Sequence, residues 1–358
     1  MRLKYIDSDI VYSTFSFDAK AECFLISDGN DNIIEYKPPI DVVPCYEPTH
    51  FSCVFLSNDS PACTENSIYQ VYVGSTRIGW IFPVQALFSN EHNYSGNVYF
   101  LKYAFVAYYH LLEMLDDVDN NLCPSEFSVA DYYESTKCLL VRDLDNCAKI
   151  NNFNFDNYVV SLFQYGYSFT GHGNLDADFE SLKDKTRLTL HAISPDLGTQ
   201  YINDLFKIHF PQLNDDVTKF YFYYQIIEMM ISTVFRVKFN NLLSEMKEDH
   251  ETLFELRDDI TKIASEKRRV RILFNEFVNG LDMSLLTDLN NACAQFLKQN
   301  QKGVSENNFY ENLYSTRCFL VHKLYSLNRE SDETLKNINS SFLNILIRML
   351  YNFKIPNN

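Results

Sequence analysis

A guanidinium and an imidazole lie five positions apart near the C-terminal end of the sequence. They are Arg317 and His322, in the segment ENLYSTRCFLVHKLY (Glu311–Tyr325). At about 100° per residue, Arg317 lies in the middle of the apolar arc of the predicted helix, and His322 lies at the edge of that arc. A guanidinium there must pair with an anion or face a site that admits one, whereas imidazole titrates near neutrality. Together the two groups could bind a phosphate and transfer a proton.

The position of Arg317 has a second interpretation. Glu228 is the single acid in the apolar segment Phe220–Phe235, which is predicted to be a core helix. An ion pair between Arg317 and Glu228 would satisfy both charges without any ligand. The helical pattern alone leaves both interpretations open.

The order of three predicted helices resembles that of the HEPN superfamily, in particular the HEPN proteins of bacterial defence and toxin systems. A long aromatic helix with an acid (FYFYYQIIEMM, Phe220–Met230) precedes a basic helix (EKRRVRILFNEF, Glu266–Phe277). The penultimate helix then reads YSTRCFLVH (Tyr314–His322). The resemblance covers about residues 180–353, half of the chain. The Arg-x4-His spacing is weak by itself, and the helix order adds specificity.

This resemblance implies that the C-terminal half is a metal-independent ribonuclease. It assigns catalysis to Arg317 and His322 only, usually at a homodimer interface. Apart from the resemblance, we expect Glu228, Tyr314 and Cys318 to support this site. Cys318 stands where the family commonly has a polar residue. The setting implied is growth arrest or phage defence, in which a phage or host trigger or an antitoxin is a possible partner. A catalytically inactive HEPN-like module for protein association is the alternative.

The residue types suit RNA cleavage. The 2′-hydroxyl of RNA can act as the nucleophile, so the mechanism requires no metal and no cofactor. His322 would transfer the proton, and Arg317 would stabilise charge on the scissile phosphate. Residues five apart on a helix diverge by about 140°, so one helix converges poorly on one phosphate. Two copies related by a two-fold axis would solve this, which favours a homodimer.

A basic run could bind the RNA backbone. Its residues are Lys267, Arg268, Arg269 and Arg271, close to a single acid, Glu266. A solvated helix face is the alternative interpretation of such a run.

One segment echoes the motif. STKCLLVRDL (Ser135–Leu144) shares six identities in ten with STRCFLVHKL (Ser315–Leu324), with Lys137 at the position of Arg317 and Arg142 at that of His322. It is either a degenerate second copy or a coincidence.

Composition indicates a cytoplasmic globular protein. Apolar residues make up 46% of the chain, enough for a sizeable core, and 31 basic against 47 acidic residues give a net charge of −16. Any contact with nucleic acid must therefore be local. Nine cysteines without zinc-finger spacing suggest free thiols in a reducing compartment. The two most hydrophobic segments, Val98–Leu112 and Phe220–Phe235, are too short to span a membrane.

The expected fold class is α+β, in three regions. Residues 1–92 carry short β-type runs separated by turn signals and form an accessory domain of unknown ligand. Residues 93–179 form a helical connector, with helices over Val98–Leu115 and Ser128–Asp145, and a turn at Gly171–Asn174. Residues 180–358 form an all-α, HEPN-like bundle of five or six helices.

Overall fold

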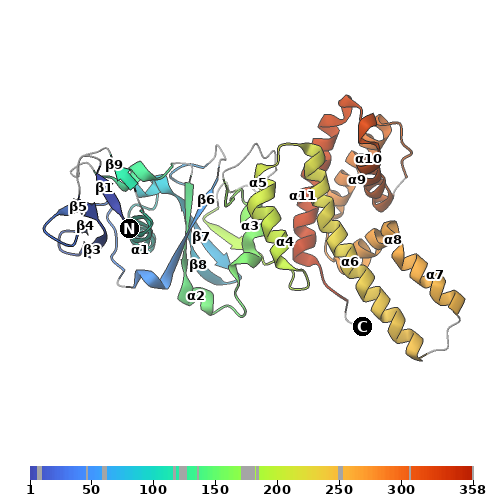
Figure 1. Ribbon diagram of the computed structural model, residues 1–358, viewed down its shortest axis with the longest axis horizontal. Coiled ribbons are helices and arrows are strands. Elements are labelled where there is room, and N and C mark those ends of the chain that lie inside the picture. The colour runs from blue at the N-terminus through green and yellow to red at the C-terminus, as the bar shows by residue number, and fades with distance from the viewer. Residues whose placement is uncertain are drawn as a thin grey trace. The chain divides into compact units, whose positions relative to one another are not determined.

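Strands form much of the first part of the chain, as predicted, and helices follow (Figure 1). The computed structural model contains 54% helix and 17% strand, which confirms the α+β class. It describes all residues except 6–9, 46, 59–62, 116–117, 121–126, 135–136, 171–181, 183–184, 249–252, 306–307 and 357–358. The turn expected at Gly171–Asn174 lies outside the described residues.

The chain divides into two compact units. The first comprises Met1–Asn154, Tyr165–His172 and Ser181–Leu190, and the second comprises Phe155–Gln164, Gly173–Glu180 and His191–Asn358. This division differs from the three regions expected from sequence, because strands from the expected connector belong to the sheet of the first unit.

In the residues that the structure describes, three sheets build the first unit. The five-stranded sheet has the order β11 (Arg187–Leu190), β7 (Tyr69–Val73), β8 (Thr76–Pro83), β10 (Lys137–Asp143) and β6 (Phe51–Ser57). A meander joins β3 (Thr14–Asp18), β4 (Cys23–Ser27) and β5 (Ile33–Tyr36), and a small sheet places β1 (Leu3–Tyr5) between β2 (Val11–Tyr12) and β9 (Val118–Asn120). The pairs β11–β7 and β1–β9 are parallel, and the other pairs are antiparallel.

Helix α1 (Val98–Glu113) forms the core of this unit. Asn97 caps the helix, since its side chain accepts hydrogen bonds from the amides of Tyr99 and Phe100 at 3.1 Å. On one side Phe105 stacks on Phe24 of β4, with ring centroids 5.5 Å apart. On the other side Phe100 contacts Trp80 of β8 at 5.9 Å. The helix therefore lies between the meander and the five-stranded sheet.

The helix predicted over Ser128–Asp145 is wrong for Lys137–Asp143. These residues form β10, a central strand between β8 and β6. Cys138–Val141 is a continuous buried run, because both faces of a central strand are covered. The matching motif residues 315–323 are helical, so the echo between Ser135–Leu144 and Ser315–Leu324 is a coincidence of sequence rather than a repeated structural unit.

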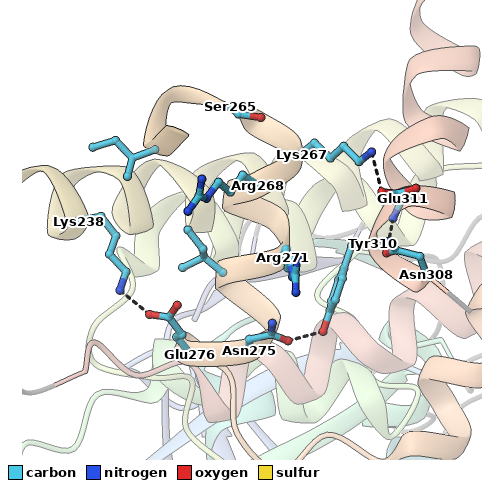
Figure 2. A pocket seen from close by; sticks show the side chains of 12 residues that line it. Lys238, Ser265, Lys267, Arg268, Arg271, Asn275, Glu276, Asn308, Tyr310 and Glu311 are labelled. Atoms are coloured by element: carbon cyan, nitrogen blue, oxygen red, sulfur yellow. Dashed lines mark hydrogen bonds and ion pairs between the residues drawn. The ribbon is translucent and has the colours of Figure 1, made fainter. Parts of the chain in front are cut away.

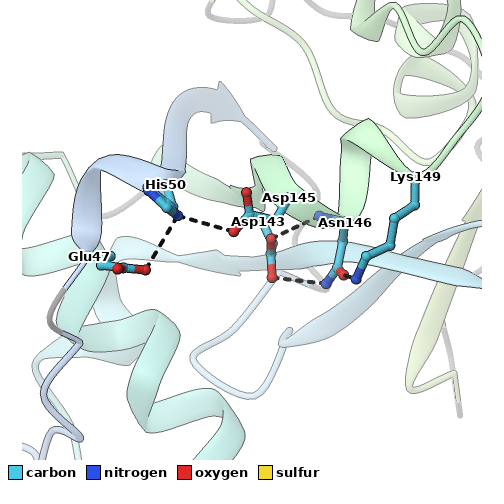
Figure 3. A network of polar contacts seen from close by, with 6 residues as sticks. All are labelled: Glu47, His50, Asp143, Asp145, Asn146 and Lys149. Atoms are coloured by element: carbon cyan, nitrogen blue, oxygen red, sulfur yellow. Dashed lines mark hydrogen bonds and ion pairs between the residues drawn. The ribbon is translucent and has the colours of Figure 1, made fainter.

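A polar network follows the end of β10 (Figure 3). Asp143 caps the short helix α2 (Leu144–Ala148) by accepting a hydrogen bond from the amide of Asn146 at 3.0 Å. His50 Nδ1 lies 3.1 Å from an Asp145 carboxylate oxygen and 3.4 Å from one of Glu47. These exposed contacts connect the start of β6 to the end of β10.

The second unit is helical. Its helices are α3 (Val159–Gln164), α4 (Thr199–Asp204), α5 (Phe210–Gln212), α6 (Asp216–Glu248), α7 (Leu253–Ala264), α8 (Glu266–Ile272), α9 (Met283–Gln299), α10 (Phe309–Lys323) and α11 (Asp332–Asn352). A π-helical turn, Leu273–Phe277, continues α8, and another, Leu205–His209, joins α4 to α5. Helix α6 extends at both ends beyond the apolar segment Phe220–Phe235 that predicted it.

Aromatic contacts hold these helices together. Phe342 of α11 lies 5.6 Å from Phe220 of α6, and Phe319 of α10 lies 5.6 Å from Phe296 of α9, measured between ring centroids. Helix α10 also contacts α8. The helix with the Arg-x4-His motif is thus packed on several sides, which determines where each of its polar side chains points.

Candidate functional site

The buried face of α10 sets the directions of the motif residues. Asn308 caps the helix by accepting a hydrogen bond from the Glu311 amide at 3.3 Å. The buried residues are Asn312, Leu313, Thr316, Phe319 and Leu320. Arg317 and His322 flank this face on different sides, so their side chains diverge.

Arg317 points toward α6 and α8. Its Nη2 donates a hydrogen bond to Glu228 Oε1 at 2.8 Å, and its Nε lies 3.7 Å from Glu266 Oε1. The guanidinium also lies over the ring of Tyr224, 5.6 Å from the centroid. Only 19% of the Arg317 side chain is exposed. The ion pair with Glu228, which the sequence left as an alternative, is present.

The charges around Arg317 keep it ionised. Burial lowers the pKa of the guanidinium, but the hydrogen bond to Glu228 and the charge of Glu266 outweigh it and raise that pKa above its usual range. Tyr224 adds a hydrogen bond to Glu266 at 3.2 Å, and burial raises the pKa of its phenol. Two carboxylates therefore surround one guanidinium, and Arg317 is not free to bind a phosphate in this arrangement.

His322 lies in a different place. It is exposed and lines a pocket of about 410 Å³ between α9 and α10. The lining residues are Leu297, Lys302, Gly303, Tyr314, Ser315, Cys318, Phe319, His322 and Lys323. No Asp or Glu is among them. We call this the His322 pocket. It brings together three residues predicted from sequence, Tyr314, Cys318 and His322, and it does not include Arg317.

Two lysines supply the positive charge of the His322 pocket. Lys302 follows α9, and its Nζ lies 5.5 Å from the ring centroid of Phe319. Lys323 is the last residue of α10 and is exposed. Sequence reasoning missed both lysines. Lys323 adjoins His322, which was a usable signal, whereas Lys302 comes from a loop whose path the sequence does not indicate.

Tyr314 and Cys318 lie on α10 and form part of the wall of the His322 pocket. Burial, with smaller contributions from the neighbouring Cys318 and Glu266, outweighs the opposing charge of Arg317 and raises the pKa of Tyr314 to about 12. The phenol is therefore neutral at physiological pH and can donate a hydrogen bond to an anion.

The four basic residues predicted to bind RNA divide into two groups. Lys267, Arg268 and Arg271 line one pocket of about 790 Å³, whereas Arg269 is not among its lining residues (Figure 2). The guanidinium of Arg269 lies 5.6 Å from the ring centroid of Phe235, on the side of α8 that faces α6. The pocket thus brings together three of the four basic residues and does not include Arg269.

Other expected features concern metals, thiols and membranes. In the described part of the chain, no three or more His, Cys, Asp and Glu side chains group so as to hold a metal ion. The cysteines that the structure describes are all free thiols. None of the described helices has the length and hydrophobicity needed to cross a bilayer.

Comparisons with known proteins found no match to the chain. No protein-family model, curated protein or solved structure is similar to it at a significant level. The resemblance to the HEPN superfamily thus stays a prediction based on the motif and on the order of the helices.

Proposed function

We propose that the helical unit is a metal-independent endoribonuclease and that His322 is its proton-transfer group. The observation that carries this proposal is the composition of the His322 pocket. An imidazole shares a cavity with the ammonium groups of Lys302 and Lys323, and no carboxylate is among the lining residues that the structure describes, in a chain of net charge −16. A local excess of positive charge beside an imidazole that can transfer a proton suits a phosphate diester.

The proposed reaction uses the RNA as its own nucleophile. His322 accepts the proton of a 2′-hydroxyl, the 2′-oxygen bonds to the adjacent phosphorus, and the bond to the 5′-oxygen breaks. That oxygen receives a proton and leaves as a 5′-hydroxyl, so the products are a 2′,3′-cyclic phosphate end and a 5′-hydroxyl end. Lys302 and Lys323 stabilise the charge on the non-bridging oxygens, and the Tyr314 phenol donates a hydrogen bond to them.

This assignment changes the role proposed for Arg317. Its guanidinium is held by Glu228 and Glu266, so we assign it as a positioning residue that attaches α10 to α6 and α8. His322 then keeps its orientation, because the helix that carries it, α10, packs against α6, α8 and α9.

A second copy of the chain completes the proposed site. One imidazole that accepts the first proton cannot at once donate to the leaving group, and a second His322 from a partner would supply that proton. Exposed apolar side chains flank His322 at the end of α10 and in the turn that follows: Val321 is 41% exposed, Leu324 41% and Tyr325 89%. Aromatic and aliphatic side chains of this kind are enriched at interfaces between protein chains.

A catalytically inactive association module is the second candidate. The observation in its favour is that Arg317 is neutralised by two carboxylates. Both candidates form a dimer, and only the first cleaves RNA. Growth arrest or phage defence as the biological setting stays a prediction from the resemblance.

RNA cleavage in a chelator tests the proposal. The purified protein is incubated in EDTA with an end-labelled RNA and with a matched strand that has one 2′-deoxyribose at the cut site. We expect cleavage of the RNA with a cyclic phosphate product, and resistance of the deoxy strand. Activity that EDTA abolishes and Mg²⁺ restores, or cleavage at the deoxy position, would contradict the mechanism.

A further inference from the structure

A second pocket lies apart from the His322 pocket, bounded by α6, α7, α8 and the start of α10 (Figure 2). Its volume of about 790 Å³ is within the range of small-molecule sites, roughly 300–1,000 Å³. The lining residues are Lys238, Ile263, Ser265, Lys267, Arg268, Arg271, Ile272, Asn275, Glu276, Asn308, Tyr310 and Glu311. We call it the α8 pocket.

The α8 pocket has an excess of positive charge. Its four cations face two carboxylates, and each carboxylate already holds one lysine: Glu276 pairs with Lys238, and Glu311 pairs with Lys267 at 2.8 Å. In Figure 2 dashed lines mark both pairs, and none reaches Arg268 or Arg271. Within the described part of the chain, neither arginine has an ion pair or a hydrogen bond from its side chain. Two guanidinium groups are thus available to a ligand.

The spacing of these arginines suits adjacent phosphates. Arg268 and Arg271 are three residues apart on α8 and so lie on the same side of the helix, one turn apart. Each guanidinium can donate two parallel hydrogen bonds to a phosphate, and Lys267 beside them can add a further charge. A bare phosphate ion would occupy only a small part of the cavity.

Beside Arg271, the wall of the cavity carries groups that can recognise a planar ring. The hydroxyl of Tyr310 donates a hydrogen bond to Asn275, and Asn308 lies beside them. An aromatic ring and amide groups are the side chains that stack on a nucleobase and bond its edge. The cavity therefore combines two guanidinium groups with an aromatic ring and amides.

We infer that the α8 pocket binds a nucleoside polyphosphate, with the phosphates on Arg268 and Arg271 and the base beside Tyr310. This site is separate from the His322 pocket, and its occupancy does not require RNA cleavage. A free nucleotide is the occupant to which we assign the site, because its adjacent phosphates match two guanidinium groups that lie one helical turn apart in a single cavity.

Isothermal titration with ATP, GTP, inorganic pyrophosphate and adenosine tests the inference, without Mg²⁺ so that the phosphates keep their charge. We expect saturable binding of ATP or GTP at one site per chain, weaker binding of pyrophosphate and none of adenosine. Arg268→Gln and Arg271→Gln should each weaken binding about tenfold or more, as expected for a lost charge-assisted hydrogen bond. Arg271→Lys should give a smaller loss of affinity, since lysine keeps the positive charge but cannot donate the two parallel hydrogen bonds of a guanidinium.

The matched control is Arg257→Gln, which removes an exposed arginine of α7 outside the pocket. Equal thermal midpoints of all variants would show that they are folded. Three results would overturn the inference: no saturable binding of either nucleotide at about millimolar concentration, an equal loss in Arg257→Gln, or binding of a 12-nucleotide RNA alone. None of these readouts depends on nuclease activity, so a failure here is distinguishable from a failure of the ribonuclease proposal.

Discussion

Arg317 Nη2 and Glu228 Oε1 lie 2.8 Å apart, and this ion pair joins α10 to α6 across 89 positions of the sequence. Glu266 of α8 approaches the same guanidinium at 3.7 Å. The two basic residues of the Arg-x4-His motif therefore differ in role: Arg317 is turned to its neighbouring helices, and His322 is turned to a pocket and to solvent.

Replacing Arg317 by Met should destabilise the helical unit. Methionine keeps the aliphatic part of the side chain, but Glu228 and Glu266 lose their shared partner. We expect a loss of about 1–2 kcal/mol in the free energy of unfolding. This loss is small for a hydrogen bond between charged groups, because Glu228 is 43% exposed and solvent weakens the interaction. Urea denaturation measures it.

The control for this variant is Arg236→Met, which removes an exposed arginine of α6. It should change the unfolding free energy little. In a double-mutant cycle, Glu228→Gln should lose most of its effect once Arg317 is replaced. Strictly additive effects of the two substitutions would show that the pair contributes nothing.

Two cysteines on neighbouring helices should differ in reactivity. Burial raises the pKa of Cys293 to about 12, so its thiol stays protonated at pH 8 and should react slowly with iodoacetamide. Cys318 is partly exposed and lines the His322 pocket, so it should be labelled sooner. Raising the pH toward 10 should leave Cys293 slow in the folded protein. Mass spectrometry of the labelled peptides gives both rates.

A bound ligand should protect Cys318. A non-cleavable, 2′-O-methyl RNA is expected to slow its labelling and to leave the rates of the other partly exposed thiols, Cys53 and Cys63, unchanged. Labelling of Cys318 at the same rate with and without a saturating oligonucleotide would show that RNA does not enter the His322 pocket.

The end of α10 should form a homodimer interface. We expect light scattering at micromolar concentration to give a mass of about twice 41.9 kDa. Tyr325→Glu should shift the mass to that of a monomer, because it places a charge in the apolar patch with Val321 and Leu324. Met283→Glu, at a residue 72% exposed on α9, is the control and should stay dimeric. A monomeric wild-type protein would refute the interface.

Periodicity was a good guide to the helices and a poor one to a central strand. The segments at Val98 and Phe309 are helical because their apolar residues recur at helical spacing. Lys137–Asp143 was misread because a strand covered on both faces has no alternation and resembles a short buried helix. The partner strands β6 and β8 decide its conformation, and that pairing is not local information.

The candidate site was predictable only in part, because some of its contacts depend on how distant segments pack. Glu228 was identified as the partner of Arg317 because a single acid in an apolar helix needs a counter-charge. The contribution of Glu266 depends on how α8 packs against α10, and that of Lys302 depends on the path of the chain after α9. Contacts between distant segments of this kind have no signature in either segment alone.

The rate of RNA cleavage by His322→Ala, in EDTA, tests the central claim most directly. The control is His209→Ala, which removes another exposed imidazole of the helical unit. If His322 transfers the proton, its replacement should lower the rate by about 10²-fold or more, while His209→Ala stays within about twofold of the wild type and both variants keep their thermal midpoints. Cleavage by His322→Ala at the wild-type rate, or no cleavage by the wild type, would contradict the account.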